Sequence, residues 1–438
     1  MRPVGPAPPR PSPRLWVSTT YFAEGLPYML VRFLSAVYLT DIGVKEAFLG
    51  FLNFLGLPWN FKFLWAPAVD LFGTKRSWLL NVEALIAIGA GLLALLAAFG
   101  PPTESVVAVA SAAGAGSESV RWMLALLVAL AFIAATHDVA IDAYYMEAIP
   151  DPTEQAAYTG LRVLTYRLAV VFAKSGLVGL AAWAGWTAGF GGGAACMAAL
   201  LAFHAWYLPR FETARARGSM AEVLRKFGQA FSSYVSRPQI GLVLAFVVTY
   251  KLGDEVLFAM NTPFLMREVG VSKSDLSWMA GIVGTVASIA GSLVSAWAIE
   301  RWGLRRTVWP LTLAMNLNIW AYVWLAWALP DAATRAGLAT VAGVHAYEQF
   351  AAGLGNAVLV VFIMRTCLPE WKAAHYAIAS AIASLGGTLF GGVSGVLVEQ
   401  IGYLWLYVAA FLCALPSMAV LLVLRIPDEP DSLAAVRS

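Results

Sequence analysis

Residues 61–78 read FKFLWAPAVDLFGTKRSW, in which an apolar run ends in a short charged turn and a second apolar run begins. The turn has the form acid, two residues, glycine, one residue, basic pair. A related turn at residues 300–306 reads ERWGLRR, and it also separates two apolar runs. One such turn is weak support for any fold. Two copies between hydrophobic segments predict a chain built from two related halves.

The composition is that of an integral membrane protein. The 438 residues are 60% hydrophobic and 13% charged, with a mean hydropathy of +0.71 and a net charge of +3. A soluble chain carries about 25% charged residues. Apolar runs of about 20 residues recur, and each could cross a bilayer as a helix. Cys196, Cys367 and Cys413 lie inside apolar runs without metal-ligand spacing. We therefore expect buried thiols, no metal and no cofactor.

Breaks at charge clusters and at glycine and proline clusters divide the chain into twelve predicted membrane helices. These spans are 16–39, 47–69, 78–99, 120–147, 158–182, 186–208, 239–266, 275–299, 307–329, 336–366, 373–398 and 402–424. The first span is expected to be an uncleaved helix rather than a signal peptide. The predicted organisation is a tail (1–15), a six-helix half (16–208), a linker (209–238), a second six-helix half (239–426) and a tail (427–438).

The basic residues predict the orientation of these spans. The connection after each span takes the number of that span. Most Lys and Arg residues fall in the tails, the linker and the even-numbered connections, whereas the odd-numbered connections hold Lys45, Arg121, Arg267, Lys273 and Arg335. By the positive-inside rule, both termini are expected in the cytoplasm. The predicted location is the inner, cytoplasmic membrane.

The linker 209–238 carries apolar residues at helical spacing. Met220, Val223, Leu224, Phe227 and Phe231 are expected on one face, with basic residues on another. This pattern predicts an amphipathic helix along the inner membrane surface. A plain polar linker is the alternative.

A second repeat supports two matched halves. Residues 41–45 read DIGVK after the first span, and residues 268–273 read EVGVSK after the seventh. Two six-helix halves related by an axis along the membrane normal form the architecture of the major facilitator superfamily. The predicted fold class is therefore an all-α membrane protein with twelve helices in two pseudo-symmetric halves.

Several longer stretches resemble AmpG-type permeases, in the peptide/acetyl-CoA transporter branch of this superfamily. They are FAEGLP (22–27), FKFLWAP (61–67), HDVAIDA (137–143), YRL (166–168), YKLGD (250–254) and Glu348 followed by Gly353. The resemblance covers nearly the whole chain, and it implies proton-driven uptake of anhydro-muropeptides into the cytoplasm. Related branches move acetyl-CoA or other solutes. The sequence departs from the pattern at residues 142–147, which read DAYYME, and at the loop 100–118.

Carboxylates inside the predicted spans are candidates for proton coupling, because ionisable groups in a membrane face a cavity or a partner. Asp138 and Asp142 lie four residues apart and therefore on one helix face. Two carboxylates so close do not both ionise easily, as a proton site requires. Alternatively, each pairs with Lys62, Arg162 or Arg167 and only locks helices together. The full candidate set is Asp138, Asp142, Glu24, Asp254 and Glu348, with His345 as a possible proton partner.

Cations inside the spans are candidates for binding an anionic solute, and Arg suits a carboxylate because its fork donates two bonds. The predicted substrate-binding residues are the cations Arg32, Arg167, Lys174 and Lys251, together with the carboxylate Glu255. Charge pairing remains the alternative for Arg167. At i, i+3 and i+4, Lys251, Asp254 and Glu255 could also neutralise one another. His137 is expected to face away from its neighbour Asp138.

The two charged turns are expected to act as a gate on the cytoplasmic side. The predicted gating residues are Asp70, Gly73, Lys75, Arg76, Glu300, Arg301, Gly303 and Arg305. An acidic residue there could pair with a basic group or with the positive end of a helix, and so hold the inner side shut.

These features predict a secondary transporter rather than an enzyme. We expect a monomer in the bilayer that carries a small anionic or zwitterionic solute with protons, through a cavity formed by spans 1, 4, 5, 7, 10 and 11. The alternatives are a facilitator for a peptide, acyl-CoA or sugar acid, or a membrane-embedded acyl or glycosyl transferase. The scattered histidines and short loops argue against a transferase, and the chain has neither a Walker motif nor a basic patch for nucleic acid.

Overall fold

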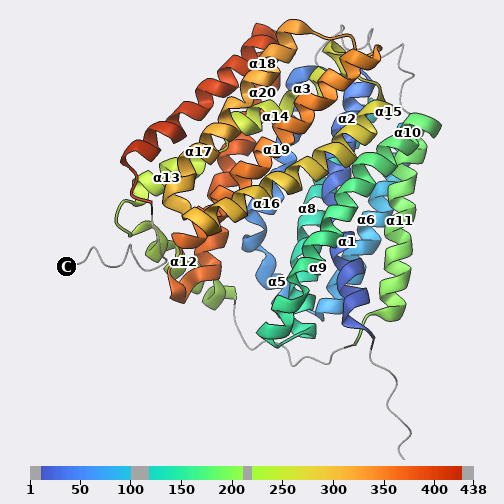
Figure 1. Cartoon of the computed structure of the whole chain (residues 1–438). Coiled ribbons are helices and arrows are strands. Elements are labelled where there is room, and N and C mark those ends of the chain that lie inside the picture. Colours follow the sequence, from blue (N-terminus) through green and yellow to red (C-terminus); the bar gives the residue numbers. More distant parts are fainter. Residues whose placement is uncertain (1–10, 100–117, 211–219, 427–438) are drawn as a thin grey trace, which may run out of the picture.

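The computed structural model describes residues 11–99, 118–210 and 220–426, and these parts form helices joined by turns (Figure 1). The predicted all-α, twelve-span fold is confirmed. Within these described residues, seven helices are each long and apolar enough to cross a membrane: Lys75–Ala98, Val120–Ala148, Pro152–Ala184, Trp186–Tyr207, Lys273–Trp302, Arg335–Arg365 and Ala374–Val423. The other spans are chains of shorter consecutive helices, and the last of the seven contains two spans that meet at Gly402.

The first half contains six spans. Span 1 is α1 (Pro13–Met29), η1 (Leu30–Leu34) and α2 (Ser35–Asp41). Span 2 is α3 (Glu46–Phe51), η2 (Leu52–Gly56), α4 (Leu57–Phe61), η3 (Lys62–Leu64) and α5 (Ala66–Leu71). Spans 3 and 4 are α6 (Lys75–Ala98) and α8 (Glu118–Ala148). Span 5 is α9 (Pro152–Val171), η4 (Phe172–Leu177) and α10 (Val178–Ala184), and span 6 is α11 (Trp186–Tyr207).

The second half follows the helix α12 (Met220–Val235). Span 7 is α13 (Ile240–Thr249), α14 (Leu252–Pro263) and η5 (Phe264–Glu268). Span 8 is α15 (Lys273–Trp278), η6 (Met279–Val283) and α16 (Gly284–Trp302). Span 9 is α17 (Leu304–Leu317) and α18 (Ile319–Ala328), and span 10 is α19 (Arg335–Arg365). Spans 11 and 12 are the two parts of α20 (Lys372–Val423), preceded by η7 (Pro369–Trp371).

Four of the spans contain a π-helical turn: η1, η4, η5 and η6. In spans 1 and 7 the π-turn begins soon after Pro27 or directly after Pro263. Proline lacks the backbone N–H that continues an α-helix, so the hydrogen-bond ladder changes there. π-turns are rare in proteins overall, but those that occur often lie at functional sites. In the described residues, spans 1, 5, 7 and 8 are thus the spans in which a π-turn interrupts the regular α-helical hydrogen bonding.

Glycines with positive φ reveal the relationship between the halves. Gly73 has φ +68° and Gly303 has φ +79°, and these are the glycines of the two charged turns. Both turns need a residue that adopts this left-handed backbone without a Cβ clash. The other four described glycines with positive φ also occur at matching connections: Gly43 with Gly270, and Gly185 with Gly402.

We call the side of the bundle where α1 begins and α20 ends the terminal side, and the opposite side the distal side. On the distal side, hydrogen bonds and ion pairs join the two halves. Arg267 pairs with Glu46 at 2.7 Å and donates to the Thr40 carbonyl at 2.7 Å, while Lys273 pairs with Asp41 at 2.8 Å. The two halves are thus closed against each other on the distal side.

The helix α12 lies on the terminal side and packs on the second half. Arg237, just beyond it, donates to the Thr366 carbonyl, and the Ser233 hydroxyl lies 2.8 Å from Nε2 of His375. Phe227 stacks on Phe63 of the first half, with ring centroids 4.6 Å apart. The side chains of Met220, Val223 and Leu224 lie outside the described part. A helix is present where the sequence predicts one, and it contacts both halves.

Candidate functional site

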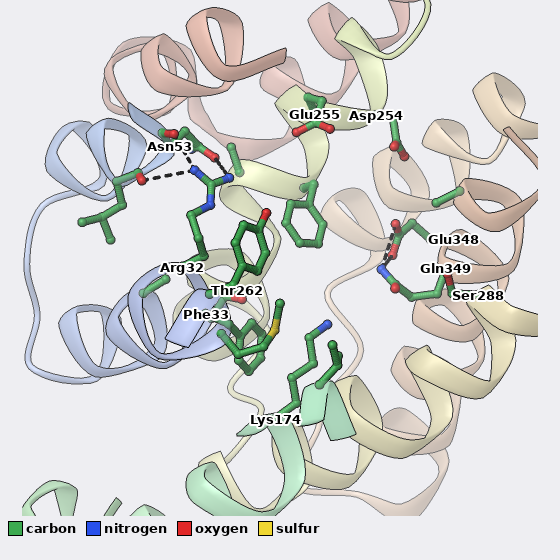
Figure 2. Close-up of a pocket in the computed structure, with 18 of the residues that line it drawn as sticks. Arg32, Phe33, Asn53, Lys174, Asp254, Glu255, Thr262, Ser288, Glu348 and Gln349 are labelled. Carbon is green, nitrogen blue, oxygen red and sulfur yellow. Dashed lines mark hydrogen bonds between the residues drawn. The ribbon is translucent and has the colours of Figure 1, made fainter. Parts of the chain in front are cut away.

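A cavity of about 330 Å³ lies between the two halves. Its lining comes from spans 1, 2 and 5 of the first half and from spans 7, 8 and 10 of the second (Figure 2). The prediction that spans 4 and 11 line the cavity is wrong; spans 2 and 8 line it instead. Span 2 reaches the cavity because it is broken into short helices around Gly56 and Pro58, which bring Leu52 and Asn53 to the centre.

Arg32 belongs to the π-turn η1 and reaches the cavity from span 1. Its guanidinium donates to the backbone carbonyl of Asn53 and, at 3.2 Å, to Oδ1 of the same residue. Figure 2 shows both contacts. Asn53 is itself held by the Gly50 carbonyl at 3.0 Å and by the Gly391 carbonyl of span 11 at 3.2 Å. The charge of Arg32 is therefore partly satisfied by carbonyl oxygens that tie spans 1 and 2 together.

Lys174 and Arg167 enter the cavity from span 5. Lys174 lies in the π-turn η4, and its ammonium sits 4.8 Å from the centroid of the Phe33 ring. In Figure 2 its side chain points into the open centre of the site. Neither cation has a carboxylate within ion-pair distance among the residues that the structure describes. These two predicted substrate-binding residues thus present unpaired positive charge to the cavity.

The second half supplies the acidic wall. Lys251 lies 3.3 Å from Asp254 and 3.4 Å from Glu255, so the three predicted residues of span 7 form the mutually neutralising group that the sequence left as an alternative. This group lines the cavity and carries one net negative charge.

Glu348 faces the cavity from α19 and is only 1% exposed. Both of its oxygens accept from Nε2 of Gln349, at 3.2 and 2.9 Å. Nδ1 of His345 lies 3.6 Å from the Glu348 carboxylate and 3.1 Å from the Tyr322 hydroxyl, which donates to Asn261 at 3.1 Å. A buried polar chain thus supports this carboxyl group, and no Lys or Arg approaches it within 4.0 Å in the described part of the chain.

A second set of charges lies in the first half, toward the terminal side. Asp138 pairs with Lys62, and Asp142 pairs with Arg162 at 2.8 Å and accepts from the Tyr21 hydroxyl at 2.8 Å. The two carboxylates therefore take separate cationic partners, as the structural alternative anticipated. Arg162 also lies 4.2 Å from the centroid of the Tyr21 ring.

Glu24 lies near this second set on span 1. Its Oε2 atom is buried and has no hydrogen-bond partner in the described part of the chain. Asp142, Lys62 and Arg162 are close enough to interact with it electrostatically. Among the predicted proton-coupling residues of the first half, Glu24 is the one whose buried oxygen lacks a hydrogen-bond partner in the described residues.

A buried carboxylate that the sequence did not single out joins spans 3, 4 and 6. Glu83 is fully buried, with Oε1 2.6 Å from Nδ1 of His204 and 3.5 Å from Nε2 of His137. His137 thus points toward Glu83 of span 3. Glu83 stands in the predicted third span as a lone carboxylate, and this was the signal available in the sequence.

The two charged turns lie on the terminal side. Lys75 donates to the Val69 carbonyl at 2.9 Å, and Arg76 donates to the Ala205 carbonyl at 2.5 Å. In the second copy, Glu300, Arg301 and Arg305 are exposed. The side chain of Asp70 lies outside the described part, so the predicted contact of this residue has no structural account. The glycines Gly73 and Gly303 shape both turns.

The sequence did not point to Gln349 and Asn53 as site residues, because an uncharged amide inside an apolar run does not stand out as a charged residue does. Both hold a predicted charged residue in place. Tyr28, Tyr166 and Asn356 also line the cavity.

Comparison with known proteins places this geometry in context. A sequence model of the Major Facilitator Superfamily matches residues 244–438. The chain is 28% identical to the anhydromuropeptide permease of Escherichia coli (strain K12) over 416 residues, which cover 92% of this chain and 78% of that protein. It is 24% identical to the putative transporter AmpG 4 of Rickettsia conorii over 419 residues, with coverage of 92% and 94%.

Solved structures share the fold. A POT family transporter in complex with 5-aminolevulinic acid superposes with a TM-score of 0.68 at 10% identity, covering 94% of this chain and 96% of that one. A D-xylose–proton symporter gives a TM-score of 0.62 at 12% identity, with coverage of 95% and 98%. These likenesses establish the arrangement of helices. The sequence relatives are permeases and transporters, so the transferase alternative is set aside.

Proposed function

We propose that this chain is a major facilitator that couples the import of an anionic or zwitterionic solute to protons by alternating access. The observation that carries the proposal is the central cavity, where unpaired cations of one half face carboxylates of the other. Intramembrane charges are costly and are retained where they bind ions, protons or substrates. The similarity to anhydromuropeptide permeases favours an anhydromuropeptide as the solute.

Lys174 and Arg167 are proposed to hold an anionic group of the solute. Both line the cavity, and neither has a carboxylate partner among the described residues. Arg32 is proposed to shape the site rather than to bind at full strength, because Asn53 and its carbonyl already engage the guanidinium. Tyr28 and Tyr166 add aromatic surface for the less polar parts of the solute.

Proton coupling is proposed for carboxylates that lack a fixed cationic partner. Glu348 and Glu24 satisfy this condition best, since neither forms an ion pair with Lys or Arg within 4.0 Å in the described residues. Asp138 and Asp142 are tied to Lys62 and Arg162, so a proton there must displace an ion pair. Asp254 shares its cationic partner Lys251 with Glu255, so it is less firmly paired than Asp138 and more firmly paired than Glu348.

Alternating access requires one side of the site to close while the other opens. The distal ion pairs supply the closure in this conformation. If the termini are cytoplasmic, as the basic residues predict, the distal side faces outward and the charged turns belong to the inner gate. We propose this orientation, with the protein acting as a monomer in the inner membrane.

The test is solute uptake into liposomes that contain the purified protein. An imposed inward proton gradient should drive accumulation of a labelled anhydromuropeptide, and a protonophore should abolish accumulation. Accumulation that persists without any ion gradient would remove the symport proposal. Competition by peptides, acyl-CoA esters or sugar acids in the same assay identifies the solute if the muropeptide is not carried.

Asp138→Asn tests whether a carboxylate that already has a cationic partner also takes part in coupling. The variant should lose the ion pair with Lys62, and proton-driven uptake should fall if Asp138 takes part in coupling. Unchanged uptake would leave Asp138 with a structural role.

A further inference from the structure

A second cavity, of about 410 Å³, lies on the distal side and shares no lining residue with the central cavity. We call it the distal pocket. The distal ends of spans 2, 7, 9, 11 and 12 line it, so span 2 of the first half meets four spans of the second half there. The pocket has this form only while the halves are closed against each other on the distal side, because their separation removes its span 2 wall.

The charged part of the distal pocket is acidic. Its described lining includes Glu46, Glu268 and Glu399, and it includes no Lys or Arg. Glu46 pairs with Arg267 at 2.7 Å, and Glu399 accepts from the backbone N–H of Ala47 at 3.0 Å. Neither Glu268 nor Glu399 has a Lys or Arg within 4.0 Å among the residues that the structure describes. The three carboxylates and Arg267 together leave two negative charges.

A buried hydroxyl without a partner lies at the same place. Tyr403 lines the pocket and is only 7% exposed, and its hydroxyl forms no hydrogen bond in the described part of the chain. Glu46 and Glu268 are close enough to act on this hydroxyl electrostatically. Burial of an unpartnered hydroxyl costs free energy. A bound group that donates to its oxygen would therefore stabilise the protein.

The remaining lining indicates which kind of cation fits. It is mostly apolar, with the side chains of Phe264, Ala326, Leu329, Val398, Ile401 and Leu404. A metal ion such as Ca²⁺ takes a shell of oxygen ligands, and no group of three His, Cys, Asp or Glu side chains in the described residues is placed to hold one. Carboxylates combined with aliphatic side chains instead suit an organic ammonium, whose N–H groups donate to the carboxylates while its carbon chain covers the apolar lining.

We propose that the distal pocket binds an organic ammonium cation of the alkylamine or diamine class, and that the bound cation holds the distal side closed. The ammonium neutralises Glu268 and Glu399 and donates to the Tyr403 hydroxyl oxygen. The site is an effector site on the distal face, distinct from the central cavity that is proposed to carry the solute.

The division of the carboxylates between the halves explains the effect on closure. Closure brings Glu46 of the first half toward Glu268 and Glu399 of the second, and like charges that approach one another oppose it. A cation between them removes this repulsion. Because the complete pocket exists only in the closed state, the cation binds that state and shifts the population toward it.

The first experiment measures the melting temperature of the purified protein in detergent at pH 7, where both amino groups of the probe 1,5-diaminopentane are protonated. The melting temperature should rise with the diamine concentration, and MgCl₂ at equal ionic strength should give a much smaller rise. An equal rise with MgCl₂ would overturn the organic class of ligand.

Variants locate the binding site. Each of Glu268→Gln and Glu399→Gln should weaken the apparent affinity for the diamine by about tenfold, because a charge-assisted hydrogen bond is lost. Both residues are exposed, as is the matched control Glu154→Gln on α9, which should respond as the wild type does. Tyr403→Phe removes an unpartnered hydroxyl, so it should weaken diamine binding without lowering the melting temperature of the free protein. A wild-type response in the double variant Glu268→Gln/Glu399→Gln would place the diamine elsewhere and overturn the site.

The second experiment measures closure. A cysteine introduced by Ala36→Cys in the central cavity, in a background without the native cysteines, is labelled from the distal side by an impermeant reagent. At ten times its dissociation constant, the diamine should slow labelling by about elevenfold if it binds the closed state alone. Unchanged or faster labelling would refute the stabilisation of the closed state. Both experiments omit solute and proton gradient, so their outcomes do not depend on whether the protein is a proton symporter.

Discussion

Removal of the Arg267 side chain should shift the protein toward the conformation that is open on the distal side. The guanidinium bridges the halves by an ion pair with Glu46 at 2.7 Å and by bonds to the Thr40 carbonyl at 2.7 and 3.2 Å. All these contacts form only while the distal side is closed. Arg267→Ala therefore weakens the closed state and should leave the open state largely unaffected.

The size of the shift follows from the contacts. Charge-assisted hydrogen bonds contribute about 1.5–3 kcal/mol each in net terms, and exposed ion pairs less than about 1 kcal/mol. The Arg267 and Glu46 side chains are both 22% exposed, so their ion pair is neither fully buried nor fully exposed. We therefore expect an energy between that of an exposed pair and that of a charge-assisted hydrogen bond. A net loss of about 2 kcal/mol corresponds to a roughly thirtyfold rise in the ratio of open to closed protein.

Thiol labelling from the distal side measures this ratio. A cysteine is placed at Ala36, which lines the cavity from span 1, in a background without the three native cysteines. While the open state is the minor one, the labelling rate by an impermeant reagent is proportional to its population, so Arg267→Ala should raise this rate by up to about thirtyfold.

Arg335→Ala is the matched control for this measurement. Arg335 is exposed at the distal start of α19, and no partner is found for it among the described residues. A labelling rate in Arg267→Ala that equals the control rate would refute the role of the distal contacts in closure.

Three further predictions concern packing and buried charge. Glu83→Gln should destabilise the first half by about 2 kcal/mol, because the buried hydrogen bond between its carboxylate and Nδ1 of His204 is weakened, and the melting temperature in detergent measures the loss; an unchanged value would show that this bond does not stabilise the fold. Gly353→Ala should lower the melting temperature, since a Cβ there would overlap the Ser288 carbonyl oxygen of α16, whereas Gly343→Ala meets nothing within 4 Å and serves as control; equal effects of the two would contradict close packing of the helices. Phe227→Ala should cost about 1 kcal/mol of stacking on Phe63, so amide exchange in α12 should become faster; unaltered exchange would show that the ring contact does not hold this helix.

The sequence was sufficient for the twelve helices because membrane burial demands long apolar runs. The predicted span 120–147 is the helix Glu118–Ala148, and the predicted span 186–208 is Trp186–Tyr207. The repeat of the charged turn also corresponds to a structural likeness, since Gly73 and Gly303 both have a positive φ.

The partners of the buried charges could not be obtained in this way. Helical spacing put Asp138 and Asp142 on one face, but their partners come from different spans, and nothing local specifies which. The hydrogen bond between Glu83 and His204 joins residues 121 positions apart. Long-range pairing depends on how whole helices tilt and turn, which no local pattern encodes.

The π-turn of span 5 has a consequence for the phase of that helix. The segment Phe172–Leu177 holds one residue more per turn than an α-helix, so the faces before and after it are offset by about 100°. Arg167 lies before this offset and Ser175, whose hydroxyl reaches the Ser277 carbonyl at 2.8 Å, lies within it. Deleting one residue there would restore the regular repeat and rotate one face out of register with the other. In an alignment, a one-residue gap inside this span would therefore signal a different cavity rather than a shorter loop.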